Sequence, residues 1–200
     1  MVVELDETPV RTLLARQGIY DKNSAIVAYE LLYRNSDAEN SHVDNLNQSS
    51  GEAATSSVLV QLFANLDVNT IIGNKQAFIN FTHSHLVQKI PMLLPKNRIV
   101  IEVLETVAID QPLLLNLMEL KKQGYQIALD DFVFRNELAP LVDMADIIKI
   151  DVLHLDQQQI AEQLLPLKSF RGKLLAEKLR TNNNSIIASI LDLIFFKVFF

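Results

Sequence analysis

Apolar runs rich in β-branched residues recur along the 200-residue chain and alternate with segments of helical spacing. A polar turn of three residues, Asp21-Lys22-Asn23, separates the first two runs, and a parallel crossover needs about a dozen residues. We therefore expect the first two strands to be antiparallel. The predicted strands are Thr12–Tyr20, Ser24–Arg34, Ala77–Phe81, Ile99–Glu105, Gln126–Phe132, Asp146–Val152, Lys173–Leu179 and Ile194–Phe200.

Helices are predicted in the later gaps, over Ala54–Leu66, Ser84–Leu94, Gln111–Lys122 and Gln157–Ser169. Asp110 and Asp156 stand in N-cap positions, and Gly124 stands where a helix ends. Strict alternation of strand and helix, with strands as apolar as IIKIDV, predicts an α/β fold, a TIM-like (β/α)8 barrel whose first strand is antiparallel. An open doubly wound sheet is the alternative, although no strand is followed by a G-x-G-x-x-G loop.

With five glycines and six prolines, the chain has too few of either for a flexible linker, so a single domain over residues 1–200 is expected. The polar segment 35–51 is predicted to be a surface loop, with disorder as the alternative. The final segment IIASILDLIFFKVFF is expected to form the eighth strand and the helix before it. Because no helix follows this strand, we expect incomplete closure at the C-terminus and an apolar patch that a downstream domain, missing from this chain, would cover.

Several classes of protein are excluded by composition. The chain has no cysteine, so disulfides, thiolate metal sites and cysteine nucleophiles are ruled out. Its net charge of −6 argues against binding a nucleic acid polymer, although it permits a small phosphate ligand held by metal ions. Neither a secretory signal nor a membrane span is evident, which predicts a cytoplasmic protein.

Charged or amide residues interrupt most of these apolar strands at or near their carboxyl ends. In a barrel these ends converge on one face, and a buried carboxylate is costly unless a cation neutralises it. Oxygen ligands without sulfur or a central histidine favour Mg²⁺, Mn²⁺ or Ca²⁺. The residues concerned are Glu30, Asn80, Glu102, Asp130, Asp131, Lys149, Asp151 and Glu177.

Each of these residues has a simpler explanation when taken alone. Asp130 and Asp131 could be the N-cap of the following helix, Lys149 a lysine at a strand edge, and Arg34 a surface residue. Glu102 could pair with a nearby cation. Together, however, these explanations require the same coincidence on five strands, so a metal site is the stronger interpretation.

In order and spacing, these motifs resemble the EAL domain, the bacterial cyclic di-GMP phosphodiesterase family. The motifs are Y-E-L-L-Y-R, F-I-N-F, I-E-V-L-E, A-L-D-D-F, I-K-I-D and L-A-E-K-L, and together they span most of the chain. The opening A-R-Q-G-I-Y-D and the A-E-K variant are most similar to EAL domains that precede an HDOD output domain. The resemblance therefore implies cyclic di-GMP as ligand, and a protein partner or a downstream HDOD-like domain.

The resemblance also implies a role for each matching residue. Glu30, Asn80, Glu102 and Asp130 would hold a first Mg²⁺ or Mn²⁺, and Asp131 a second. Arg34 would bind a ligand phosphate, Lys149 would orient the hydrolytic water, and Glu177 matches the first glutamate of A-E-G-V-E. In the family's reaction the two ions activate a bridging water that cleaves cyclic di-GMP to linear pGpG.

Three departures from the family pattern weaken the second metal site. The segment Val133–Leu138 has no glycine where active members have a glycine- and serine-rich loop, Arg180 replaces the second glutamate of A-E-G-V-E, and Q-G-Y is absent near Lys197–Phe199. We therefore expect a degenerate EAL domain that acts by binding ligand or a protein partner, with weak or no hydrolysis. An active Mg²⁺- or Mn²⁺-dependent phosphodiesterase is the alternative, and a barrel kept only as a scaffold is a third possibility.

Overall fold

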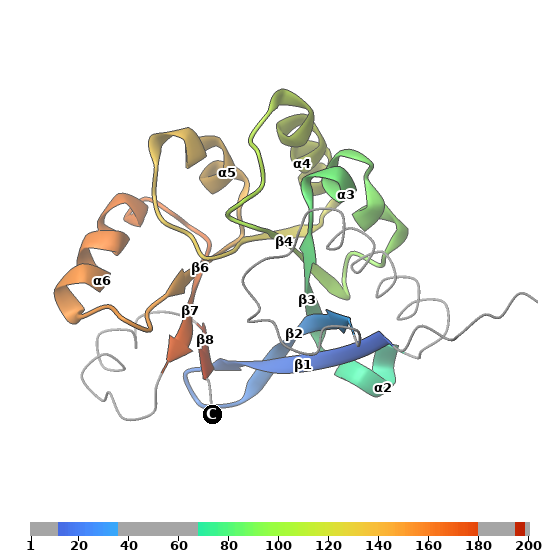
Figure 1. Ribbon diagram of the computed structural model, residues 1–200, viewed down its shortest axis with the longest axis horizontal. Helices are drawn as coiled ribbons and strands as arrows, with labels where there is room; N and C mark the ends of the chain where they lie inside the picture. Colours follow the sequence, from blue (N-terminus) through green and yellow to red (C-terminus); the bar gives the residue numbers. More distant parts are fainter. Residues whose placement is uncertain (1–11, 36–67, 180–194, 199–200) are drawn as a thin grey trace, which may run out of the picture.

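A computed structural model describes residues 12–35, 68–179 and 195–198, which include eight strands (Figure 1). The strands are β1 (Thr12–Asp21), β2 (Ile26–Asn35), β3 (Gln76–Phe81), β4 (Ile99–Val103), β5 (Gln126–Leu129), β6 (Ile147–Asp151), β7 (Lys173–Leu179) and β8 (Phe195–Val198). All eight fall at the predicted places, with ends that differ by a few residues. The predicted second strand begins later than expected because Ser24, at φ 61°, belongs to the turn.

The strands form a closed barrel in chain order, β1 through β8. Strand β1 is antiparallel to both β2 and β8, and the remaining neighbours are parallel. The TIM-like barrel and its antiparallel first strand are therefore confirmed, and the open doubly wound sheet is excluded. The expected gap at the C-terminus is closed by two residue pairs, Tyr20 with Phe196 and Asp21 with Phe195.

The hairpin between β1 and β2 follows from the side chain of Asp21. Its Oδ1 accepts hydrogen bonds from the backbone N–H groups of Asn23 and Ala25, both at 2.9 Å. A short acidic side chain that satisfies two backbone donors fixes a tight turn. Sequence spacing alone was sufficient to predict this reversal.

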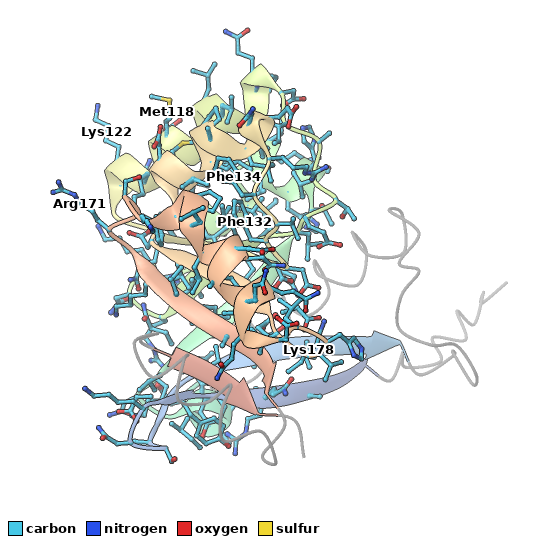
Figure 2. The ribbon with its side chains drawn as sticks, turned by 90° about the vertical axis from the view of Figure 1, so that its left-hand side faces the viewer. Met118, Lys122, Phe132, Phe134, Arg171 and Lys178 are labelled. Atoms are coloured by element: carbon cyan, nitrogen blue, oxygen red, sulfur yellow. The ribbon has the colours of Figure 1, made fainter. Side chains whose placement is uncertain are left out.

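Helices lie outside the ring of strands (Figure 1). They are α2 (Val68–Ile72), α3 (His83–Val87), α4 (Gln111–Gln123), α5 (Ala139–Met144) and α6 (Gln157–Leu164), with short 3₁₀ segments η2 (Ile90–Leu93), η3 (Asn136–Leu138) and η4 (Leu165–Leu167). Helix α4 begins where Asp110 accepts from Leu113 N at 2.9 Å and ends at Gly124, whose φ is 92°. Met118 and Lys122 on this helix point away from the barrel (Figure 2).

The helix predicted over Ser84–Leu94 is instead two short pieces, α3 and η2. Lys89 lies between them in the left-handed region at φ 60°, and Pro91 follows. The predicted helix over Gln157–Ser169 likewise changes to η4 at Leu165, next to Pro166. The predicted helix Ala54–Leu66 and most of the loop 35–51 lie outside the described residues.

Two apolar clusters fix the position of the site. The larger cluster fills the space between strands and helices. The smaller one contains one residue from each of β1 to β7: Ile19, Ala28, Phe78, Val100, Ala128, Ile147 and Leu175. Since alternate residues of a strand point to opposite faces, these seven side chains form the inner apolar layer of the barrel.

No helix within the described residues is long and apolar enough to cross a membrane.

Candidate metal centre

A polar layer lies directly above the inner apolar layer. Two positions after an inner residue, on each strand or just beyond its end, the chain carries Glu30 (β2), Asn80 (β3), Glu102 (β4), Asp130 (β5), Lys149 (β6) and Glu177 (β7). Because residues two apart share a face of a strand, all six side chains project into the barrel near its carboxyl-terminal mouth. Parallel registers place Asn80 beside Glu102.

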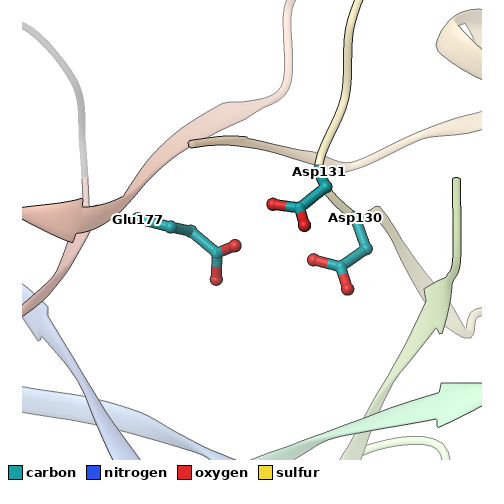
Figure 3. A group of neighbouring side chains, drawn as sticks. All are labelled: Asp130, Asp131 and Glu177. Atoms are coloured by element: carbon teal, nitrogen blue, oxygen red, sulfur yellow. The ribbon is translucent and has the colours of Figure 1, made fainter. Parts of the chain in front are cut away.

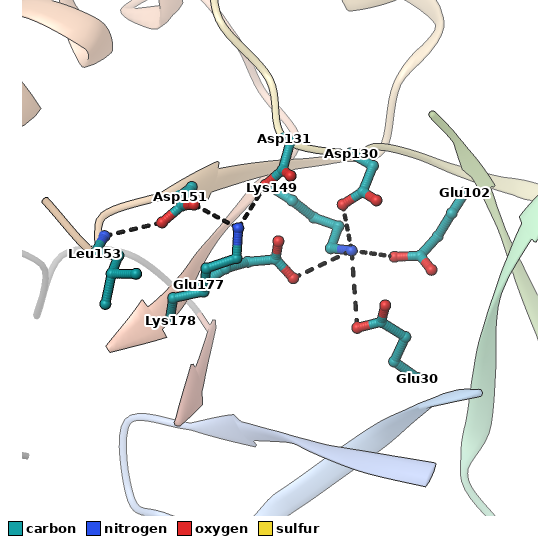
Figure 4. A network of polar contacts seen from close by, with 9 residues as sticks. All are labelled: Glu30, Glu102, Asp130, Asp131, Lys149, Asp151, Leu153, Glu177 and Lys178. Carbon is teal, nitrogen blue, oxygen red and sulfur yellow. Dashed lines mark hydrogen bonds and ion pairs between the residues drawn. The ribbon is translucent and has the colours of Figure 1, made fainter. Parts of the chain in front are cut away.

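Lys149 is the centre of this layer (Figure 4). Its Nζ lies 2.5 Å from Asp130 Oδ1, 2.6 Å from Glu102 Oε1, 3.1 Å from Glu177 Oε1 and 3.9 Å from Glu30 Oε2. The Lys149 side chain is 1% exposed. A buried ammonium is tolerated here because carboxylates from four strands surround it.

The charges of this group are strongly coupled. Burial alone would lower the pKa of Lys149, but the surrounding carboxylates, first Glu102 and then Glu30, raise it well above its ordinary value. Burial raises the pKa of Glu102 well above its ordinary value, and Lys149 opposes that effect. Lys149 therefore stays positively charged, and its ammonium opposes the cost of burying the Glu102 carboxylate.

A second group lies at the edge of this layer. Carboxylate oxygens of Asp130, Asp131 and Glu177 lie within 4.8 Å of one another (Figure 3). Asp131 has a left-handed backbone, with φ 39°, so its side chain turns toward the other two. Burial, and then the neighbouring Asp130, raise the pKa of Asp131.

The donor atoms fit a hard divalent cation. Asn80 Oδ1 and Glu102 Oε2 are buried and have no hydrogen-bond partner among the described residues. Such oxygens are costly to bury unless they bind a cation or water. All the candidate ligand atoms are carboxylate or amide oxygens, which Mg²⁺ and Mn²⁺ prefer.

The structure thus brings together seven of the eight predicted site residues: Glu30, Asn80, Glu102, Asp130, Asp131, Lys149 and Glu177. The eighth, Arg34, lies on β2 four residues after Glu30, and its side chain is outside the described part. Arg180 also lies outside the described residues.

Two residues near the site, Gln17 and Lys178, were not singled out from the sequence, and Asp151 was named among the strand-end carboxylates without a role of its own. Asp151 is two positions after Lys149 on β6, and its Oδ2 lies 2.5 Å from Lys178 Nζ. Gln17 pairs with Glu30 across the antiparallel β1–β2 ladder, so both side chains share a face. Two-residue periodicity, counted from Ile19, could have located Gln17.

The segment after Asp131 lies beside the site. Phe132 N donates to Lys149 O at 2.9 Å, and the Phe132 ring packs edge-on against Phe134, with centroids 6.4 Å apart (Figure 2). A cavity of about 340 Å³ lies beside this segment, with Asp130, Asp131 and Arg135 among the residues that line it. Space for a small ligand therefore adjoins the carboxylates.

Comparison with known proteins identifies an uncharacterised protein and a cyclic di-GMP phosphodiesterase as relatives. The chain is 35% identical over 178 residues to YuxH, an uncharacterised protein of Bacillus subtilis, covering 86% of this chain and 42% of that protein. It is 30% identical over 197 residues to the cyclic di-GMP phosphodiesterase CdgJ of Vibrio cholerae, covering 98% of this chain and 45% of CdgJ. The chain spans less than half the length of both relatives. No protein-family model matches it.

Solved structures agree in fold. The Klebsiella pneumoniae protein BlrP1, in complex with manganese and cyclic di-GMP, superposes with a TM-score of 0.72 at 20% identity, covering 96% of this chain and 55% of BlrP1. An EAL domain protein of Listeria monocytogenes gives a TM-score of 0.68 at 20% identity, covering 94% and 85% of the two chains. Together with the motif order, these similarities support the assignment of the chain to the EAL domains.

Proposed function

We propose that this chain is one EAL-like domain of bacterial cyclic di-GMP signalling, which binds the dinucleotide or a protein partner and hydrolyses the dinucleotide weakly or not at all. The observation that carries this proposal is the polar layer around Lys149, in which Asn80 Oδ1 and Glu102 Oε2 have no hydrogen-bond partner among the residues that the structure describes. The ligand is taken from two similar proteins: CdgJ is a cyclic di-GMP phosphodiesterase, and BlrP1 binds cyclic di-GMP together with manganese.

Within this proposal, the chain's residues have separate tasks. Glu30, Asn80, Glu102 and Asp130 hold a first Mg²⁺ or Mn²⁺, Asp131 is the candidate ligand of a second, and Arg34 binds a phosphate of the ligand. Divalent cations at such a site neutralise phosphate charge and make a nearby water more acidic. Lys149 adds a fixed positive charge beside the phosphate, and the Glu177 carboxylate is placed to accept a proton.

Weak turnover is supported by the Asp131 side of the site. The segment Val133–Leu138, which leads into η3 and α5, has no glycine, so the left-handed backbone conformations of a glycine-rich loop are costly there. Lys178 also places a second ammonium 3.7 Å from Asp131 Oδ1. Binding needs the first group of ligands, whereas efficient hydrolysis needs both groups arranged around one reacting water.

An active phosphodiesterase is the alternative function. It is favoured by one observation: Lys149, Glu177 and all five candidate metal ligands are present. The carboxylate oxygens of the outer group, Asp130, Asp131 and Glu177, lie within 4.8 Å of one another. A signal read by a protein partner or a downstream HDOD-like domain is compatible with either function.

Calorimetric titration with cyclic di-GMP, with and without Mg²⁺, tests binding. We expect heat of binding that depends on Mg²⁺ and is lost in Glu30→Gln, whereas the exposed control Glu119→Gln, on α4, keeps it. No heat under either condition would contradict ligand binding and leave the protein-partner or scaffold role.

Incubation of the protein at high concentration with cyclic di-GMP and Mn²⁺, assayed for pGpG, separates the weak or inactive domain from an efficient enzyme.

A further inference from the structure

Lys178 has a backbone conformation that is unusual for its residue type. Its φ of 57° lies in the left-handed region, which glycine adopts far more readily than lysine. It directly follows Glu177, at a place where the pairing of β7 with β8 shifts register between Ala176 and Leu179. A side chain kept at a strained position is expected to make contacts that offset the strain.

The contacts of Lys178 are with two carboxylates of the site (Figure 4). Its Nζ lies 2.5 Å from Asp151 Oδ2 and 3.7 Å from Asp131 Oδ1. Asp151 is itself fixed, because its Oδ1 accepts from Leu153 N at 2.9 Å. The Lys178 side chain is 31% exposed, so this ammonium lies at the mouth of the barrel and not inside it.

The negative charge of the aspartates at the mouth of the barrel is therefore already neutralised in part by Lys178. Asp131 belongs to the outer group of carboxylates, with Asp130 and Glu177, which is the group placed to take a second divalent cation. A fixed positive charge close to Asp131 repels a divalent cation at that place by direct Coulomb interaction. Lys178 forms an ion pair with Asp131, whereas Lys149 pairs with the neighbouring Asp130.

We propose that Lys178 is an internal cation that substitutes for a second divalent cation beside Asp131 and Asp151. The domain then binds a single ion, in the inner group of ligands formed by Glu30, Asn80, Glu102 and Asp130. This inference rests on the proposed metal binding by that inner group. Lys178 is a positioning residue: it holds the two aspartates in place and keeps the outer group from taking up metal.

The test is the number of Mn²⁺ ions bound, measured on the whole chain by calorimetry and by the electron paramagnetic resonance signal of free Mn²⁺. We expect the wild type to bind one ion. Lys178→Gly and Lys178→Met should gain a second ion with affinity at least about tenfold tighter than any outer binding in the wild type. Lys178→Arg, which keeps the charge, should still bind one.

Lys89 provides a matched control. It also has a left-handed backbone, at φ 60°, and its Nζ lies 2.5 Å from a carboxylate, Glu119 Oε2, on the outside of the barrel. Lys89→Gly should therefore leave Mn²⁺ binding unchanged. Circular dichroism of every variant establishes that it is folded before the titration.

The two proposals fail in different ways. If the wild type binds no Mn²⁺, the proposed metal function fails, whatever the Lys178 variants do. If Lys178→Gly and Lys178→Met gain no ion relative to the wild type, or Lys178→Arg gains one, the role of Lys178 is refuted, and metal binding by the inner group still stands on the wild-type result.

Discussion

Lys149 Nζ lies 2.6 Å from Glu102 Oε1 in the barrel interior, and neither side chain is more than 1% exposed. A buried ammonium and a buried carboxylate each carry a large desolvation cost, which their mutual attraction offsets only while both are present. Three further carboxylates face the same ammonium. Lys149 thus supplies the positive charge that these four carboxylates share.

Replacing Lys149 with methionine should sharply destabilise the metal-free domain. The change leaves four carboxyl groups close together without a cation, and loss of one partner of a buried ion pair costs about 3 kcal/mol or more. The free energy of unfolding from denaturant titration in EDTA measures the loss. We also expect Mn²⁺ to raise the melting temperature of Lys149→Met more than that of the wild type.

The control is Lys89→Met, which removes an ion pair whose two side chains are 40% and 44% exposed. Exposed pairs contribute little because water screens them, so this variant should unfold close to the wild type. Equal stability of Lys149→Met and the wild type would mean that the carboxyl groups do not depend on this ammonium.

The polar layer packs on the inner apolar layer, so a substitution in the apolar layer should also weaken metal binding at the site. Leu175 is fully buried, pairs in register with Lys149 and lies two positions before Glu177. Leu175→Ala should cost about 2–5 kcal/mol of unfolding free energy, as large-to-small changes in a core do, and should weaken Mn²⁺ binding. Leu115→Ala, on the exposed face of α4 where the side chain is 57% exposed, should change neither measurement appreciably.

Much of this arrangement is predictable because strands buried on both faces are almost entirely apolar. Any carboxylate in such a strand stands out, and the two-residue period then assigns it to the inner face. Glu30, Glu102 and Lys149 were predicted because they are charged residues near the carboxyl ends of apolar strands. The closing strand was also predicted, although its junction with β1 is only two residue pairs long.

The parts that sequence could not supply depend on contacts between distant segments. Lys178 is 27 residues from Asp151 in the chain, and no local pattern links the two. Helix α5 is only six residues long and has no side-chain cap, so Pro140 in its first turn is a weak signal of its start. The break at Lys89 likewise depends on a left-handed residue for which lysine is not a typical choice.

Asp110 predicts a pH-dependent contribution to stability. Its hydrogen bond from Leu113 N, and then its contact with His83, lower the pKa of its carboxyl group from the ordinary value of 3.8. A lowered pKa means that the folded state favours the ionised form, so this stabilisation is present above the ordinary pKa and is lost as the pH falls through the lowered value.

Unfolding of Asp110→Ala should therefore occur at lower denaturant concentration than unfolding of the wild type near neutral pH. The difference should shrink as the pH falls below 3.8. Denaturant titrations of both proteins across this range test the expectation. A difference that stays constant down to the most acidic conditions would exclude ionised Asp110 as the source of the cap's stability.

Asn80 separates the stability of the empty site from its affinity for metal. Its Oδ1 is buried without a hydrogen-bond partner among the described residues, beside Glu102 in the register of β3 and β4. An unsatisfied buried polar atom costs about 1–3 kcal/mol, so Asn80→Leu should be as stable as the wild type, or more stable, in EDTA. The same variant loses one oxygen ligand and should gain less from Mn²⁺.

The measurement is the thermal unfolding of both proteins in EDTA and in rising Mn²⁺ concentration. A cation present at a hundredfold excess over its dissociation constant stabilises the protein that binds it by about 2.7 kcal/mol, which is readily visible as a rise in melting temperature. We expect the wild type to show this rise and Asn80→Leu to show much less of it. If Asn80→Leu instead loses stability in EDTA and keeps the full response to Mn²⁺, then Asn80 is a structural residue of the barrel and Glu30, Glu102 and Asp130 bind the ion without it.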